Sequence, residues 1–154
     1  LFRSILETLH SMAPYLQDII GTNVELELAF NGDLRGGVHA NSDQIVRIIE
    51  NIVENANCAM SGKGKIKIDC FEDADNFVMV ISNSGPSIPK HIVDKIFMPF
   101  VTSRKEGGTG LGLYLAYEYL TSCGGSIQLR NHNKNVGFMI TLPRSKEPSE
   151  LNAI

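Results

Sequence analysis

The stretch "EGGTGLGLYLAYEYL", from Glu106 to Leu120, contains four glycines within six residues and then continues as a helical pattern. Glycine permits tight backbone paths but destabilises regular structure, so its concentration where a helix begins needs a physical reason. Glycine-rich loops at helix starts present backbone N–H groups to anions such as phosphate. We therefore predict a phosphate site here; the alternative is the hinge of a mobile lid that binds no ligand.

The spacing of these glycines excludes two common phosphate-binding loops. The chain contains no GxxxxGK[ST] segment, which excludes a P-loop. Gly108, Gly110 and Gly112 follow the pattern GxGxG, and no strand pattern precedes them, which excludes the dinucleotide-binding GxGxxG turn. The kind of phosphate site therefore depends on the rest of the chain.

Length and composition indicate one globular domain. The chain has 154 residues, of which 43% are hydrophobic and 20% charged, and its net charge of −3 does not favour a nucleic-acid surface. It has no signal peptide and no apolar run near the ~20 residues of a membrane span, so we predict no membrane segment in this chain and a cytoplasmic location. Cys58, Cys70 and Cys123 are widely spaced and are expected to be reduced core thiols.

Hydrophobic periodicity predicts helices inserted between strands. We expect helices near 1–20, 41–60 and 110–122, a short helix within 85–97, and strands over 24–30, 36–40, 65–73, 76–84, 125–132 and 136–143. Asn41 is expected to cap the long helix. The chain begins inside a helical pattern, so we expect a fragment of a longer polypeptide. This order predicts an α+β domain with one sheet and helices on one face.

The helix predicted over 41–60 has an unusual polar side. Asparagine is a poor residue for a helix interior, yet Asn51 and Asn55 lie one turn apart, with Glu54 beside them. A solvated polar face is one interpretation. The other is that amide oxygens and a carboxylate face a ligand. Magnesium binds hard oxygen ligands, usually keeps several waters and takes its remaining ligands from phosphates.

Four segments in this order resemble the ATP-binding catalytic domain of sensor histidine kinases. They are "NIVENA" (51–56), "NSGPSIP" (83–89), "IFMPF" (96–100) and "GGTGLGL" (107–113), which match the N box, first glycine box, F box and second glycine box of that family. The wider group includes type II topoisomerase ATPase subunits, mismatch-repair ATPases and a heat-shock chaperone. The resemblance covers residues 24–143, and the F box favours the kinases.

The resemblance implies a fold and a division of the chain. The fold is a two-layer α/β sandwich, the Bergerat ATP-binding fold, with a mixed, mostly antiparallel sheet covered on one face by helices. Residues 1–20 are expected to form a linker helix from a missing dimerisation domain, 21–143 the catalytic domain, and 144–154 a flexible tail.

The resemblance also implies site residues for ATP and Mg²⁺. Asn55 is the expected magnesium ligand, Asn51 lies near the phosphates, and Glu54 assists transfer. A lid over residues 98–109 is expected to close on ATP. The expected catalytic set is Asn51, Glu54, Asn55 and Lys105, and the expected nucleotide-binding set is Asn51, Asn55, Asn83, Gly85, Ile88, Phe97, Thr102, Ser103, Arg104, Lys105, Gly108, Thr109, Gly110, Leu111, Gly112 and Leu113.

The chain departs from the family pattern at two positions of the first glycine box. The family has aspartate where this chain has Asn83, and glycine where it has Ser87. An amide keeps an acceptor oxygen but adds donors, so adenine recognition is expected in altered form. The same changes leave open a nucleotide-binding regulatory module without transfer activity. An anti-sigma-type serine kinase is disfavoured by the F box.

The phosphoryl acceptor is expected outside this chain. The resemblance implies transfer of the γ-phosphoryl group to a histidine on a separate dimerisation domain, and then to a response regulator. "HSMAPYL", from His10, only loosely matches the family's histidine motif, because its proline is one residue too close. We therefore interpret His10 as an ordinary helix residue.

Overall fold

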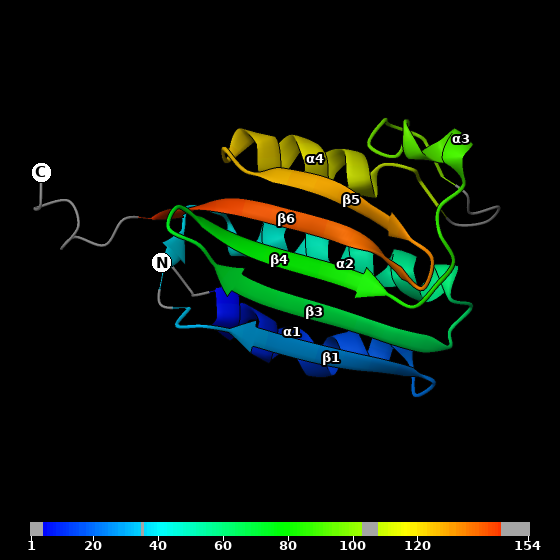
Figure 1. The fold of residues 1–154 in the computed structure, drawn as a ribbon, viewed down its shortest axis with the longest axis horizontal. Coiled ribbons are helices and arrows are strands. Elements are labelled where there is room, and N and C mark those ends of the chain that lie inside the picture. The colour runs from blue at the N-terminus through cyan, green and yellow to red at the C-terminus, as the bar shows by residue number, and fades with distance from the viewer. Residues whose placement is uncertain (1–4, 35, 103–107, 146–154) are drawn as a thin grey trace, which may run out of the picture.

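The computed structural model describes residues 5–34, 36–102 and 108–145 (Figure 1). The helices are α1 (Ile5–Ile20), α2 (Ser42–Ala59), α3 (Lys90–Val93) and α4 (Gly112–Ser122). The strands are β1 (Val24–Asn31), β2 (Gly37–Val38), β3 (Gly64–Glu72), β4 (Asn76–Asn83), β5 (Ser126–His132) and β6 (Asn135–Ser145).

The strands form one mixed sheet. Their order is β1-β3-β4-β6-β2, and β5 also pairs with β6. The β1–β3 pair is parallel, and the pairs β3–β4, β4–β6, β5–β6 and β2–β6 are antiparallel. Helices α1 and α2 lie behind the strands in Figure 1, and α4 lies along β5 at the top of the view. The predicted two-layer sandwich with a mostly antiparallel sheet is confirmed.

Side-chain alternation along β3 explains the two layers. Ile66, Ile68 and Cys70 are buried on the helix side. Burial raises the pKa of the Cys70 thiol to about 12, so it stays protonated at neutral pH. On the open side, Lys65 and Lys67 alternate with these residues and pair with carboxylates of β1 and β3. One face of the sheet is therefore core and the other a solvated surface.

Helix α1 is an integral part of the core. Its Leu9 and Leu16 are fully buried in the same hydrophobic cluster as Ile49 of α2 and Val24 of β1. Its predicted connection to a dimerisation domain concerns residues beyond this chain and stays a prediction. None of the helices in the described ranges is long and apolar enough to cross a membrane.

Two local predictions are refined at the ends of elements. Asn41 caps α2, because its side-chain oxygen accepts from the N–H groups of Asp43 (2.9 Å) and Gln44 (3.3 Å). Strand β6 continues to Ser145, two residues beyond the predicted boundary, because its end pairs with β2. The rest of the predicted tail, residues 146–154, lies outside the described residues.

The cysteines differ from the prediction of three core thiols. Cys70 is buried, Cys123 is half-buried and Cys58 is exposed. Cys58 is exposed because it lies on the polar side of α2, opposite the buried stripe that packs on the sheet. All three are free thiols.

Candidate functional site

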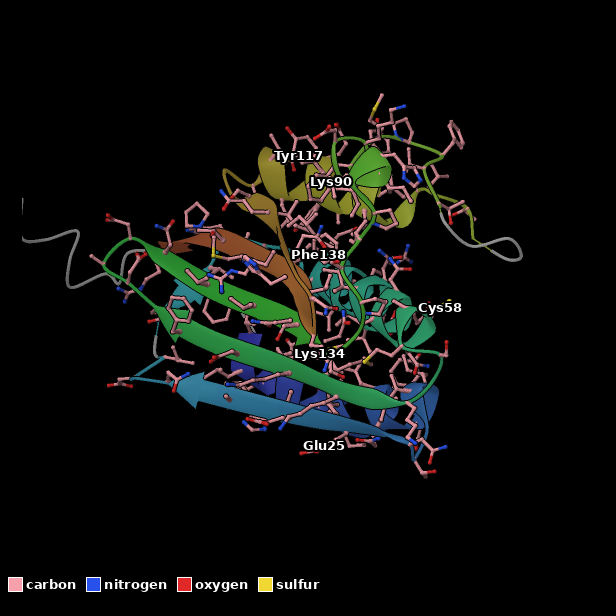
Figure 2. The ribbon with its side chains drawn as sticks, turned by 45° about the vertical axis from the view of Figure 1, so that its right-hand side comes forward. Glu25, Cys58, Lys90, Tyr117, Lys134 and Phe138 are labelled. Atoms are coloured by element: carbon pink, nitrogen blue, oxygen red, sulfur yellow. The ribbon has the colours of Figure 1, made fainter. Side chains whose placement is uncertain are left out.

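A cavity of about 560 Å³ opens at one end of the sheet. Its walls come from the C-terminal half of α2, the loop after β4, the segment around Val101 and Thr109, the start of α4 and the start of β6. These segments meet at the right-hand end of Figure 1, and Figure 2 shows Cys58 of α2 and Phe138 of β6 on this side. The volume falls in the range of small-molecule sites.

Helix α2 presents its polar side to this cavity. Asn51, Glu54 and Asn55 all line it. The helix cannot rotate away, because Ile45 and Ile49 on its other side are buried in the core. The structure thus brings together the three polar residues predicted from the sequence, with Asn51 and Asn55 half-buried and Glu54 exposed on the cavity wall.

Asn51 of the N box lies against Gly112 of the second glycine box. A Cβ atom at position 112 would overlap the amide group of Asn51. Nδ2 of Asn51 is buried and has no hydrogen-bond partner. Buried amide donors are normally satisfied, so this N–H₂ group is suited to donate to a ligand oxygen. The glycine is required here because it allows the helix start to approach that amide.

The start of α4 adds anion-binding character to the same wall. The N-cap residue Leu111 makes no side-chain capping bond, while Gly112 and Leu113 line the cavity. The first N–H groups of a helix lack intrahelical partners, and the helix dipole favours negative charge there. This end of the cavity therefore fits phosphate oxygens.

The lid segment, residues 98–109, is joined at its base by one backbone bond. The Phe100 N–H donates to the Gly110 carbonyl at 2.9 Å. Gly110 has φ +69, and a Cβ atom there would lie 2.5 Å from the carbonyl carbon of Phe100. Thr102, Gly108 and Thr109 line the cavity. The predicted phosphate-binding residues Ser103, Arg104 and Lys105 lie outside the described residues.

The first glycine box, residues 83–89, forms another wall of the cavity. Asn83, Ser87 and Ile88 line the cavity. Oδ1 of Asn83 accepts from the Gly85 N–H at 2.8 Å, which fixes the orientation of the amide. Nδ2 of Asn83 makes no hydrogen bond within the described part of the chain. The amide therefore keeps an unused donor beside the cavity.

Three predicted binding residues do not line the cavity in the described structure. Phe97 stacks on Tyr117, with ring centroids 5.7 Å apart, and meets Phe138 edge-on at 6.1 Å, so it packs as a core residue. Gly85 lies in the turn after Asn83, where its N–H donates to the Asn83 side chain. Leu111 is the N-cap residue of α4. A motif match selects a whole segment of consecutive residues, but only the packing of that segment decides which of its side chains face the cavity.

Several lining residues were not predicted. They are Cys58, Pro86, Ser87, Pro89, Ile92, Ile96, Val101, Val136, Gly137 and Phe138, besides Ile52, Ala56 and Ala59 on the apolar side of α2. The β6 residues read as ordinary strand core in the sequence, so nothing local distinguished them. Ser87 and the prolines had a signal, because they belong to the first glycine box.

Comparison with known proteins agrees with this geometry. Residues 40–146 match the family described as histidine kinase-, DNA gyrase B-, and HSP90-like ATPase. The chain belongs to this family. The match includes the N box, both glycine boxes and the F box, so the resemblance found in the sequence is confirmed.

Individual relatives in this family are sensor kinases. Sporulation kinase D of Bacillus subtilis is 34% identical over 143 residues, which cover 84% of this chain and 28% of the relative. Alginate biosynthesis sensor protein KinB of Pseudomonas aeruginosa is 34% identical over 123 residues, which cover 79% of this chain and 20% of the relative. This chain therefore spans only about a quarter of such relatives. The nucleotide-free catalytic domain of histidine kinase ThkA superposes with a TM-score of 0.75 at 29% identity, covering 92% of both chains.

The cavity fits ATP, the nucleotide of this family. Asn51 offers a buried, unpaired donor, and the α4 start offers free N–H groups, which match phosphate oxygens. Among the described lining residues Glu54 is the one charged side chain. Triphosphate charge therefore needs an added cation or basic residues such as Arg104 and Lys105, whose positions are not described.

The oxygen atoms on the cavity wall also suit a magnesium ion that the protein shares with the phosphates. No group of three or more His, Cys, Asp or Glu residues in the described ranges is arranged to hold a metal alone. Magnesium commonly takes one or two protein oxygens and completes its shell with phosphates and water. The Asn55 amide oxygen on the cavity wall suits that role.

Proposed function

We propose that this chain binds Mg²⁺–ATP and donates the γ-phosphoryl group to a histidine on a separate dimerisation domain, as the catalytic domain of a two-component sensor histidine kinase. The observation that carries the proposal is the buried, unpaired Asn51 amide against Gly112, because it leaves a donor for phosphate where the N box meets the second glycine box. The sensor-kinase relatives support the same conclusion.

Each wall of the cavity has a part in this reaction. Asn51 and the first N–H groups of α4 bind phosphate oxygens, and Asn55 would hold the metal through its amide oxygen. The bound Mg²⁺ would supply positive charge that offsets the charge of the phosphates. Glu54 lies one residue before Asn55 and is exposed, so its carboxylate is placed to orient the incoming imidazole or accept its proton. Phosphoryl transfer depends mainly on such positioning.

Exposed apolar side chains of the lid and α4 offer the dimerisation domain a surface on which to dock. Met98, Phe100, Leu115 and Tyr117 are exposed apolar side chains, with exposed fractions of 54%, 76%, 57% and 42%. Large exposed apolar side chains of this kind are typical of protein contacts. A response regulator would then receive the phosphoryl group from the histidine of the dimerisation domain.

A transfer assay tests the proposal. The chain is mixed with a histidine-bearing dimerisation domain from a related kinase and γ-labelled ATP, and label on the histidine is measured. Glu54→Gln should bind ATP but transfer slowly, while Asn57→Ala, on the same helix but away from the cavity, should match the wild type. ATP binding without any transfer to several such domains would favour the regulatory module instead.

A further inference from the structure

An asparagine outside every sequence motif holds one wall of the cavity. Ile127 and Leu129 of β5 face the helices, and the next inward position is Asn131, which pairs with Val136 of β6. An apolar residue is expected at such a position, because inward positions of this strand pack on the core. A half-buried amide there needs hydrogen-bond partners.

Asn131 finds both partners on the loop of the first glycine box. Its Oδ1 accepts from the Ile88 N–H at 2.6 Å, and its Nδ2 donates to the Ile88 carbonyl at 2.9 Å. One side chain thus supplies the donor and the acceptor that a neighbouring strand would offer to this residue. The two residues are 43 positions apart in the sequence.

The same hairpin also holds the other end of the loop. The Lys134 N–H, in the β5–β6 turn, donates to the Gly85 carbonyl at 3.0 Å. Figure 2 shows Lys134 beside the end of the sheet where this loop passes. Pro86 and Pro89 have no N–H groups, so the loop cannot form a strand ladder of its own. The start of the loop is also held to β3, where the Ser84 N–H donates to the Lys65 carbonyl at 3.0 Å. The bonds from the hairpin hold the loop beyond Ser84, at Gly85 and Ile88.

We propose that Asn131 is a positioning residue for the nucleotide base. The inference rests on the proposed function and adds a place for the base: with the triphosphate at the Asn51–Gly112 end, the base lies against the cavity wall formed by Asn83 and Ile88, here called the base wall. Asn131 touches no ligand in this arrangement. It fixes the backbone of Ile88, so that the base wall has its bound shape before ATP arrives. Loss of the two bonds frees the base wall and leaves the phosphate end unchanged.

The test compares a ligand that has a base with one that lacks it. Affinities for Mg²⁺–ATP and for Mg²⁺–tripolyphosphate are measured by calorimetry on the wild type, Asn131→Leu and Asn131→Ser. Asn133→Leu in the exposed β5–β6 turn is the matched control. Leucine has the same branched outline and removes both bonds, so ATP affinity should fall about tenfold or more while tripolyphosphate affinity stays unchanged. Serine is smaller and places a single hydroxyl nearer the β5 backbone, so it removes the paired bonds without adding volume and should show the same selective loss.

The outcomes separate positioning from general destabilisation. An equal loss for ATP and tripolyphosphate, or no loss for either, would overturn the role of Asn131. Thermal unfolding without ligand identifies a variant that fails to fold, in which case Asn131→Ser decides by the same ratio of affinities. A wild-type chain that binds tripolyphosphate but gains nothing from the adenosine group would also overturn it. A wild-type chain that binds neither ligand would overturn the proposed function itself.

Discussion

The two loops that border the cavity differ in how they are held. The first-glycine-box loop, residues 83–88, is fixed by its own Asn83–Gly85 bond and by the bonds from Asn131 and Lys134. The described ends of the lid meet at the Phe100–Gly110 backbone bond, and the Phe100 side chain is 76% exposed. An exposed apolar side chain makes few buried contacts, which is typical of regions of low local stability.

This difference implies a division of labour. The base wall is built by the protein alone, so its selectivity is a property of the free chain. The phosphate end contains an unpaired donor at Asn51, and the Phe100 side chain of its lid is exposed, so we expect this end to be completed by the ligand.

Loss of the metal ligand should have the largest effect. Asn55→Ala removes the amide oxygen proposed to hold Mg²⁺, so magnesium-dependent ATP binding should be abolished while the fold is kept. Calorimetry with and without magnesium measures this, with Asn57→Ala on the same helix as control. Unchanged affinity in Asn55→Ala would remove this residue from the metal site.

The second largest effect is expected from Gly112→Ala, which adds a methyl group between the N box and the second glycine box. In Gly112→Ala the new Cβ would overlap the Asn51 amide, which must then move from its place. One buried hydrogen bond left unmade costs about 1–3 kcal/mol, so ATP affinity should fall roughly ten- to a hundredfold. Leu115→Ala on the exposed side of α4 is the control for nucleotide binding. Equal affinities of Gly112→Ala and the wild type would mean that Asn51 does not contact phosphate.

The base wall is tested by Asn83→Asp. Oδ1 of Asn83 is held by the Gly85 N–H, so a second carboxylate oxygen would replace the unused Nδ2 donor. A pure acceptor favours adenine's amino group and repels guanine's oxygen, so the preference for ATP over GTP should rise by roughly tenfold. Competition titrations with both nucleotides measure the ratio, and Asn133→Asp controls for the added charge. An unchanged ratio would show that Asn83 does not set base choice.

The lid should gain protection when nucleotide binds. Amide hydrogen exchange at Val101, Thr102, Gly108 and Thr109 is expected to slow severalfold with Mg²⁺–ATP, because these residues line the cavity that the nucleotide would fill. The Ile88 amide, already bonded to Asn131, should change much less. Equal protection of the lid residues with and without nucleotide would contradict a nucleotide-gated lid.

The smallest effect is expected on the alkylation rate of Cys58 when ATP occupies the cavity. Cys58 is exposed and lines the cavity, so bound ATP should slow its alkylation a fewfold. Cys70 is buried and its pKa is raised to about 12, so at pH 7–8 it remains an unreactive thiol in either state. Mass spectrometry of alkylated peptides distinguishes the two. Alkylation of Cys58 at the same rate with and without saturating ATP would place the nucleotide away from this wall.

The sequence by itself determined the elements and the family. Period-two and period-3.6 patterns place strands and helices because one face of each must be buried. The cap at Asn41, the paired asparagines of α2 and the glycine-rich start of α4 are local signals with local causes, and each lies where it was predicted. The order of the four boxes was sufficient to identify the family.

The tertiary structure decided which side chains share the cavity. Asn131 and Ile88 are 43 residues apart, and no local pattern connects an asparagine of β5 with a loop after β4. Phe97 belongs to a matching motif, yet it packs on Tyr117 and Phe138, which lie 20 or more residues further along the chain. Sheet pairing brings distant segments into contact, and long-range contacts of that kind are specified by the packed core as a whole.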